Sequence, residues 1–379
     1  MHIVFLTSEY PKLGNSHGGI GTFVQTLSRW MVNAGHHVSV VGINYDSEYY
    51  QEIDNGVHVY RLPRKRLKGL TWFLHNRAIH NKLSALNKTN PIDIIEGSEL
   101  SFAFLPRISK IVYLIRLHGG HHFFAESENR GINYWKGIQE RRSFRRADAV
   151  VGVSKYAVVQ TSKYLSFLEK LKGIISCPLD ISKFQTSASP KINKGRIFFV
   201  GTICEKKGIK ELIQAIPIVK SAFPEASLHI AGRDWVFPET GNSYMQYVKQ
   251  FIDPAMEDSI HFMGPISNIE IPNLLEIAEV CCYPSHMETF GIVAIEAMAM
   301  GKPVVFTKLG PGPEIIEHGE TGFLCNPLDP KDIATQIISI MSNTENAKKI
   351  GEKAKESVIT RFSIDEIGAQ NIGLYESLL

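Results

Sequence analysis

The feature that most constrains the fold of this 379-residue chain is an alternation of short apolar runs with amphipathic stretches. Residues 2–7 form the first apolar run, and residues 37–43 form the next. Between them, residues 22–34 carry large apolar side chains at helical spacing, namely Phe23, Leu27, Trp30 and Met31. Short strands that alternate with helices are typical of βαβ units. We therefore expect an α/β protein built on parallel sheets.

The alternation breaks near residue 180 and then restarts. Residues 176–180 read Ser-Cys-Pro-Leu-Asp, a polar stretch covers residues 185–194, and a new apolar run begins at residue 196. A chain of this length also exceeds what one hydrophobic core usually spans. We predict two α/β domains of similar size, residues 1–178 and residues 179–362, with the last helical stretch (about residues 363–379) packing back onto the first. Further strands are expected at residues 92–96, 111–118, 149–153, 227–232, 261–263, 280–283 and 303–307.

Composition predicts a soluble, cytoplasmic globular protein. Hydrophobic residues make up 44% of the chain and charged residues 21%, and no apolar run is long enough for a transmembrane helix. The apolar N-terminus lacks a basic region and a small-residue cleavage site, so we interpret it as a buried first strand and not as a signal peptide. The five cysteines are scattered without metal-ligand spacing, which favours reduced, buried thiols.

Charge is distributed unevenly along the chain. Residues 1–180 contain 23 Lys and Arg against 14 Asp and Glu, whereas the remainder contains 18 against 24. The basic runs at residues 64–68 and 141–146, with the aromatic stretch 70–74, suggest that the protein binds peripherally to an anionic membrane surface, at the inner face of the membrane. Solvated helix faces are the alternative. No RNA- or DNA-binding module accompanies these runs, so nucleic acid is not an expected partner.

Glycine-containing segments follow two strands of the first half. Gly18 and Gly19 belong to a Gly-Gly-Ile-Gly sequence that opens a helix, where backbone amides can approach an anion; a simple turn is the alternative. His118 comes directly after the run at residues 111–117 and precedes two glycines, so it faces either a ligand or a buried structural partner. His121 and His122 follow, but no carboxylate lies nearby at ligand spacing, and we expect no metal site.

The strand at residues 196–200 leads into Gly201, Thr202 and then the adjacent Lys206 and Lys207 before Gly208. Free amides in a glycine turn and lysine ammonium groups together suit a diphosphate. The spacing is not that of a P-loop. Solvated lysines at a helix start remain the alternative.

The most informative segment is residues 284–298, which follows the strand at residues 280–283. A helix is expected to begin near Phe290, so the amides of Gly291, Ile292 and Val293 would be free to bind an anion. Glu288 and Glu296 lie eight residues apart on either side of these amides. Carboxylates beside anion-binding amides favour a ligand with many hydroxyl groups, although capping or surface acids would explain either one alone.

This segment resembles the E-x7-E signature of family 4 of the retaining glycosyltransferases, which have the GT-B fold. Further segments match along nearly the whole chain: the glycine loop at Gly18-Gly19, Leu117-His118-Gly119, residues 147–154 and residues 309–323. Two departures stand out. The family often has Arg where this chain has Thr202, which leaves Lys207 as the matching cation, and the hinge often reads Pro-Asn-Gly-Val-Asp where this chain has residues 176–180.

The resemblance implies two Rossmann-like domains facing a central cleft and transfer of a hexose-type sugar from a nucleotide-diphosphate sugar, UDP- or GDP-linked, with retention. The acceptor would be a hydroxyl of a glycan, a lipid-linked molecule or a small molecule, in polysaccharide, lipopolysaccharide or glycolipid synthesis. Lys207 and the amides near Gly291 would stabilise the leaving diphosphate, Glu288 would orient the sugar, Glu296 the ribose, and His118 would line the sugar pocket. No cofactor or metal is expected. A nucleotide-sugar epimerase, a sugar phosphorylase on the same fold, or an anionic-surface binding protein are the alternatives.

Overall fold

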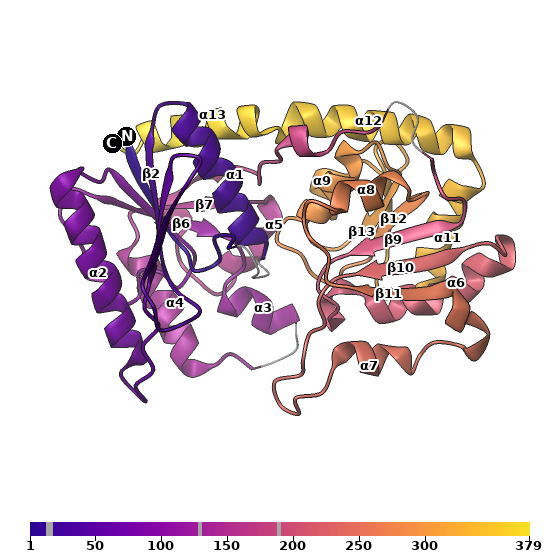
Figure 1. The fold of residues 1–379 in the computed structure, drawn as a ribbon, viewed down its shortest axis with the longest axis horizontal. Helices are drawn as coiled ribbons and strands as arrows, with labels where there is room; N and C mark the ends of the chain where they lie inside the picture. Colours follow the sequence, from indigo (N-terminus) through magenta and orange to yellow (C-terminus); the bar gives the residue numbers. More distant parts are fainter. Residues whose placement is uncertain (13–17, 128–130, 188–190) are drawn as a thin grey trace. The chain divides into compact units, whose positions relative to one another are not determined.

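The computed structural model describes residues 1–12, 18–127, 131–187 and 191–379. The chain divides into two compact units (Figure 1). Unit 1 comprises Met1–Pro178 together with Ile364–Leu379, and unit 2 comprises Leu179–Ser363. Each unit has a mainly or wholly parallel sheet with helices, which confirms the α/β class. Among the helices in the described part of the chain, none combines the length and apolarity needed to cross a membrane.

The sheet of unit 1 has eight strands in the order β3-β4-β2-β1-β5-β6-β7-β8. Every pair is parallel except β3 and β4, which form an antiparallel hairpin at one edge that the sequence analysis did not predict. Its turn is Asn55-Gly56, where both residues have positive φ (47° and 83°), as a type I′ hairpin requires. The strands are β1 (His2–Leu6), β2 (His37–Ile43), β3 (Tyr50–Asp54), β4 (Val57–Leu62), β5 (Ile94–Gly97), β6 (Val112–Leu117), β7 (Ala149–Gly152) and β8 (Leu171–Ile174).

The helices of unit 1 include α13, which comes from the end of the chain and packs beside α1 (Figure 1). Trp30 Nε1 donates to Asp365 at 2.7 Å. A Cβ at Gly368 would lie 2.5 Å from the Trp30 ring, so only glycine allows this close packing. The helices are α1 (Gly19–Asn33), α2 (Thr71–Thr89), α3 (His121–Ser127), α4 (Tyr134–Arg146), α5 (Lys155–Ser162), α13 (Ile364–Glu376) and the short η1 (Leu168–Lys170).

A buried polar network fixes α13 to the sheet of unit 1. Arg116 on β6 donates to both carboxylate oxygens of Glu96 on β5, at 2.6 and 3.0 Å. Tyr375 on α13 donates to Glu96 at 2.7 Å, and Asn371 on the same helix accepts from Arg116 at 2.5 Å. Because Arg116 and Glu96 are almost fully buried, each charge depends on these partners for stability.

The sheet of unit 2 has six parallel strands in the order β11-β10-β9-β12-β13-β14. This is the doubly wound order of a Rossmann fold, in which the chain reverses direction between the first and fourth strands. The strands are β9 (Arg196–Val200), β10 (Ser227–Ala231), β11 (Ile260–Gly264), β12 (Val280–Tyr283), β13 (Val304–Thr307) and β14 (Phe323–Cys325). Ligands bind such sheets outside the carboxyl ends of the two strands at the reversal, here β9 and β12.

Helices cover the sheet of unit 2, and α6 and α9 begin at its carboxyl edge because they are the first α-helices after β9 and β12. α6 begins one residue after Gly208, and α9 begins one residue after Gly291. The elements are α6 (Ile209–Ala222), α7 (Tyr244–Lys249), α8 (Ile271–Glu276), α9 (Ile292–Ala299), α10 (Gly312–Ile315), α11 (Pro330–Met341), α12 (Thr344–Phe362), η2 (Ile181–Lys183), η3 (Glu205–Lys207) and η4 (Pro254–Ser259).

Candidate functional site

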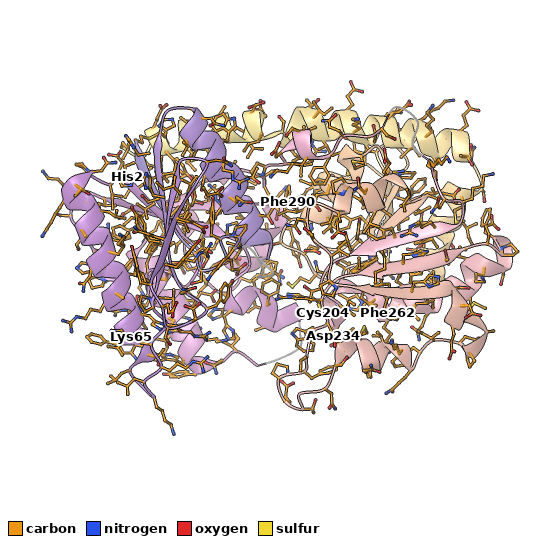
Figure 2. All side chains as sticks on the ribbon, viewed as in Figure 1. His2, Lys65, Cys204, Asp234, Phe262 and Phe290 are labelled. Carbon is orange, nitrogen blue, oxygen red and sulfur yellow. The ribbon has the colours of Figure 1, made fainter. Side chains whose placement is uncertain are left out.

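The loops that follow β9 and β12 meet at the reversal point of the unit 2 sheet. The backbone N–H of His286 donates to the carbonyl of Lys206 at 2.9 Å. Gly208 has φ +67°, and a Cβ there would lie 1.9 Å from the carbonyl oxygen of Pro284. A glycine is therefore required where the two loops touch. Cys204 and Asp234, labelled in Figure 2, mark the ends of β9 and β10 at the same edge, where residues 203 and 234 form a β-bridge.

Lys207 and Glu288 form an ion pair between these two loops. The side chains are 19% and 12% exposed, so water screens the pair only partly. Ser285 Oγ donates to the same Glu288 oxygen at 3.0 Å. Burial lowers the pKa of Lys207, but the attraction of Glu288 outweighs burial and raises it, so Lys207 carries a full positive charge at neutral pH.

The start of α9 offers backbone amides beside this ion pair. Gly291 caps the helix with φ +105°, and a Cβ there would lie 2.5 Å from the ring of Phe306. No side chain caps the helix, and in the part of the chain that the structure describes the N–H groups of Ile292 and Val293 have no hydrogen-bond partner. Free amides at a helix N-terminus attract an anion. A lysine and free amides therefore lie together at the reversal point.

Glu296 lies one turn further into α9. Its carboxylate forms no hydrogen bond or ion pair with any residue that the structure describes. Burial raises its pKa to about 7 and outweighs the charge of Lys183, which lowers it. An unpaired, desolvated carboxylate is costly in a folded protein unless it serves a ligand. Hydroxyl groups that donate to Glu296 would compensate that cost.

Phe290, at the predicted start of this helix, is also a candidate donor-binding residue. It is buried, and its ring packs against Phe362 with centroids 5.6 Å apart. The side chain thus belongs to the core of unit 2, which leaves the backbone as the part of Phe290 that could contribute to a donor site. Gly201 and Thr202 lie directly after β9, and Thr202 is half-buried.

Unit 1 has its own group of candidate residues. Gly18 is the N-cap of α1, no side chain caps that helix, and Gly19 is its first residue. His118 follows β6, and its ring packs edge-on against Phe23 of α1 at 4.9 Å. Neither ring nitrogen of His118 bonds to any residue in the described ranges. Burial, aided by the nearby Arg116, lowers the pKa of His118 to about 3, so the imidazole is neutral at physiological pH.

Two buried carboxylates beside His118 were missed by the sequence analysis. Glu99 Oε1 accepts the N–H of Gly119 at 2.7 Å, and Glu140 accepts the N–H groups of His121 and His122 at 2.8 and 3.0 Å. Burial raises the pKa of Glu99 to about 8. Glu99 follows the carboxyl end of β5 by two residues, and that position was the signal that could have found it.

The surroundings of His122 include a carboxylate that sequence spacing did not reveal. The sequence analysis found no carboxylate at ligand spacing near His121 and His122, and the fold pairs His122 Nδ1 with Glu140, which is 18 residues away. The glycine before them is required by the same carboxylate, because a Cβ at Gly120 would lie 1.7 Å from Glu140 Oε1. Among the described residues, no group of three or more His, Cys, Asp or Glu side chains has the arrangement to hold a metal ion.

The chain matches known glycosyltransferases along its whole length. The family described as Glycosyl transferases group 1 matches residues 182–357, and Glycosyltransferase Family 4 matches residues 17–182. N-acetyl-alpha-D-glucosaminyl L-malate synthase of Bacillus anthracis is 36% identical, over 98% of this chain and 96% of that protein. A glycosyltransferase of Methanocaldococcus jannaschii is 27% identical, over 99% and 98%.

Solved structures share the fold. Sucrose-phosphate synthase from Thermosynechococcus elongatus superposes with a TM-score of 0.85 at 21% identity, covering 100% of this chain and 98% of that one. HepE of Anabaena, solved in complex with UDP-glucose, gives 0.78 at 21% identity, with 100% and 99% covered. These structures have the GT-B fold, and the relatives are glycosyltransferases and synthases. The chain therefore belongs to glycosyltransferase family 4 and is a glycosyltransferase with the GT-B fold.

Proposed function

We propose that the protein transfers a hexose-type sugar from a UDP- or GDP-linked donor to a hydroxyl acceptor with retention of anomeric configuration. The observation that carries this proposal is the Lys207–Glu288 pair beside the free α9 amides, at the point where the unit 2 sheet reverses. At the carboxyl edge of this sheet, the arrangement combines the full positive charge of Lys207, the partial positive charges of the α9 amides and the carboxylate of Glu288. A nucleotide diphosphate joined to a sugar presents the complementary groups.

The relatives support a nucleotide-sugar donor. HepE was solved with UDP and with UDP-glucose, and a TarM mutant of S. aureus was solved with fondaparinux, alpha-GlcNAc-glycerol and UDP. The Bacillus anthracis relative is named N-acetyl-alpha-D-glucosaminyl L-malate synthase. A UDP-sugar is accordingly the first donor to test, and a GDP-sugar the second.

Each unit 2 side chain then has a distinct task. Negative charge grows on the leaving diphosphate as the glycosidic bond breaks, and Lys207 with the amides of Ile292 and Val293 stabilises that charge. Glu288, held by Ser285 and Lys207, accepts hydrogen bonds from donor sugar hydroxyls and fixes the sugar in place. Glu296 has no hydrogen-bond or ion-pair partner among the described residues, and its carboxylate accepts hydrogen bonds from the two ribose hydroxyls.

Retention follows if the acceptor attacks from the face that the diphosphate leaves. The departing phosphate oxygen then takes the acceptor's proton, and the protein supplies position and electrostatics. His118 is neutral, so it contributes hydrogen bonding to the sugar and no charge. We propose that Lys207 and the α9 amides perform the charge neutralisation that a divalent metal performs in other transferases, so turnover proceeds without one.

Calorimetric titration tests the proposal. UDP-, GDP- and ADP-sugars are titrated into the wild-type protein and into Glu296→Gln. One nucleotide sugar should bind clearly more tightly than the others, and the Glu296→Gln variant should bind it more weakly, because the neutral amide offers one acceptor oxygen where the carboxylate offers two charged ones. Product analysis by NMR then reports the anomeric configuration. Failure of every nucleotide sugar to bind, or cleavage of the donor with no transfer to any acceptor, would contradict the proposal.

A further inference from the structure

Unit 1 carries a continuous surface of exposed apolar and basic side chains that the proposed reaction does not use. We define the aromatic–basic patch as the segment of residues 64–73, Phe104, and the face of α4 that includes Trp135, Arg142 and Arg145. Figure 2 labels Lys65 in the segment that leads into α2. The sequence analysis noted the two basic runs separately, and the fold joins them.

Aromatic contacts hold the patch together. The Trp72 ring lies 4.5 Å from the Phe104 ring and 6.2 Å from the Trp135 ring, and Phe104 and Trp135 are stacked at 5.5 Å. The guanidinium of Arg142 lies 5.4 Å from the Phe104 ring centroid. These contacts connect the starts of α2 and α4 into one surface.

The basic segment before α2 is fixed on this surface. Thr71 Oγ1 donates to the carbonyl of Leu67 at 2.8 Å, and Trp72 Nε1 donates to the carbonyl of Gly69 at 2.9 Å. The N–H of Lys65 donates to His75 Nε2 at 3.1 Å. The segment therefore presents its side chains from a defined backbone.

The apolar part of the patch faces solvent. The exposed fractions are 51% for Leu67, 50% for Leu70, 46% for Phe73 and 47% for Trp135. Residues of this size clustered beside one another, rather than scattered, indicate a binding surface. A solvated helix face would not concentrate large apolar side chains in this way.

The charged part of the patch lacks counter-ions. Within the ranges that the structure describes, no carboxylate forms an ion pair with Arg64, Lys65, Arg66, Lys68 or Arg145. Arg142, Arg145 and Arg146 line a shallow hollow of about 200 Å³ with Ile138. Burial and the like charges of Arg142 and Arg107 lower the pKa of Arg146, whose guanidinium donates to the carbonyls of Phe102 and Leu105.

We propose that the aromatic–basic patch docks unit 1 on an anionic lipid bilayer. Cations at the level of the headgroups with Leu, Phe and Trp side chains at the acyl boundary are the arrangement of interfacial membrane proteins. A soluble polyanion would use the cations but would gain nothing from exposed Leu67, Leu70 and Phe73. The inference goes beyond the proposed reaction and does not depend on the identity of the donor.

Vesicle flotation tests the proposal with wild-type protein. Vesicles of phosphatidylcholine mixed with phosphatidylglycerol should carry the protein upward at low salt, whereas vesicles of phosphatidylcholine alone should carry little. A variant with Arg64, Lys65, Arg66 and Lys68 changed to Gln should lose affinity for the anionic vesicles by at least on the order of 100-fold. The matched control changes the same net charge on unit 2: Lys331, Lys348, Lys349 and Lys353 to Gln. It should bind as the wild type does.

A second pair of variants tests the apolar part. Phe73→Ser should weaken vesicle binding, whereas Ile269→Ser, an exposed apolar residue of unit 2, should not. Lipids brominated in the acyl chain should quench the tryptophan fluorescence of the wild type, and less so that of Trp135→Phe. Thermal melting and nucleotide titration on every variant verify the fold, and nucleotide affinity should be unchanged.

Three results would overturn the proposal. Equal binding to neutral and anionic vesicles is one, and wild-type binding by the quadruple patch variant is another. The third is binding to soluble heparin fragments with no binding to vesicles and no quenching, which would assign the patch to a soluble polyanion. If the wild-type protein bound no nucleotide sugar at all, that result would refute the proposed reaction but would not affect the membrane inference.

Discussion

Replacement of Lys207 by Ala removes the cation that pairs with Glu288; among the described residues, no other cation forms an ion pair with this carboxylate. Helix termini supply partial charges, so the amides of α9 compensate this loss only in part. Removing a charge-assisted contact to a developing anion costs about 2–4 kcal/mol, or roughly 30- to 1000-fold in rate. The unpaired Glu288 carboxylate then adds repulsion toward the diphosphate. We therefore expect kcat/KM to fall toward the upper end of that range.

Steady-state kinetics with the donor identified by calorimetry measures this effect. Lys206→Ala is the matched control, because it removes the same charge from the neighbouring residue and should cost much less. The double variant Lys207→Ala with Glu288→Gln separates the two contributions. Donor binding should partly recover in it, since no uncompensated carboxylate remains, while kcat stays low. A Lys207→Ala enzyme within threefold of the wild type would mean that the diphosphate binds elsewhere.

The remaining predictions concern three other residues. Because the pKa of Glu296 is raised to about 7 in the folded protein, its charge opposes folding increasingly as pH rises from about 4.5 to 7; Glu296→Gln should therefore raise Tm at pH 8 but hardly at pH 5. The affinity of the wild type for the nucleotide sugar should rise from pH 6 to pH 8, because Glu296 loses its proton over this range. Equal affinity at the two pH values would refute the assignment of Glu296 to the ribose. His118→Ala should lower kcat by about 10- to 100-fold with little change in Tm, as its ring has no described hydrogen bond; a large drop in Tm at normal turnover would restore a structural role. Gly291→Ala should cost about 1–3 kcal/mol by calorimetry or urea unfolding, because a methyl group meets Phe306, whereas Gly319→Ala, with positive φ but open space, should cost less; equal costs would contradict the steric argument.

Local pattern determined the α/β class and pointed to the loops that follow the strands. Helical spacing near Phe23 and the apolar run at residues 280–283 are properties of contiguous residues, so they can be recognised without knowledge of the fold. The Asn55-Gly56 turn was also visible in the sequence, and the β3–β4 hairpin could have been predicted from it. The E-x7-E spacing likewise belongs to one short segment.

The tertiary structure decided which of these segments meet. Lys207 pairs with Glu288 across 81 residues because β9 and β12 are neighbours in the sheet, and strand order is not encoded in periodicity. Glu99, in the turn after β5, and Glu140, on α4, likewise reach the segment after His118 across 20 and 19 residues, a pairing that periodicity does not reveal.

The end of the chain gives the clearest example of this difference. Asn371 reaches Arg116 across 255 residues, and Tyr375 reaches Glu96 across 279. The sequence showed an amphipathic helix near the C-terminus, because that depends only on local spacing. Its partners are a buried ion pair on β5 and β6, which requires hydrogen bonds that only a returning helix supplies. Burial and long-range pairing therefore set the electrostatics of this network, whereas local sequence pattern specifies the helix and strands that carry its residues.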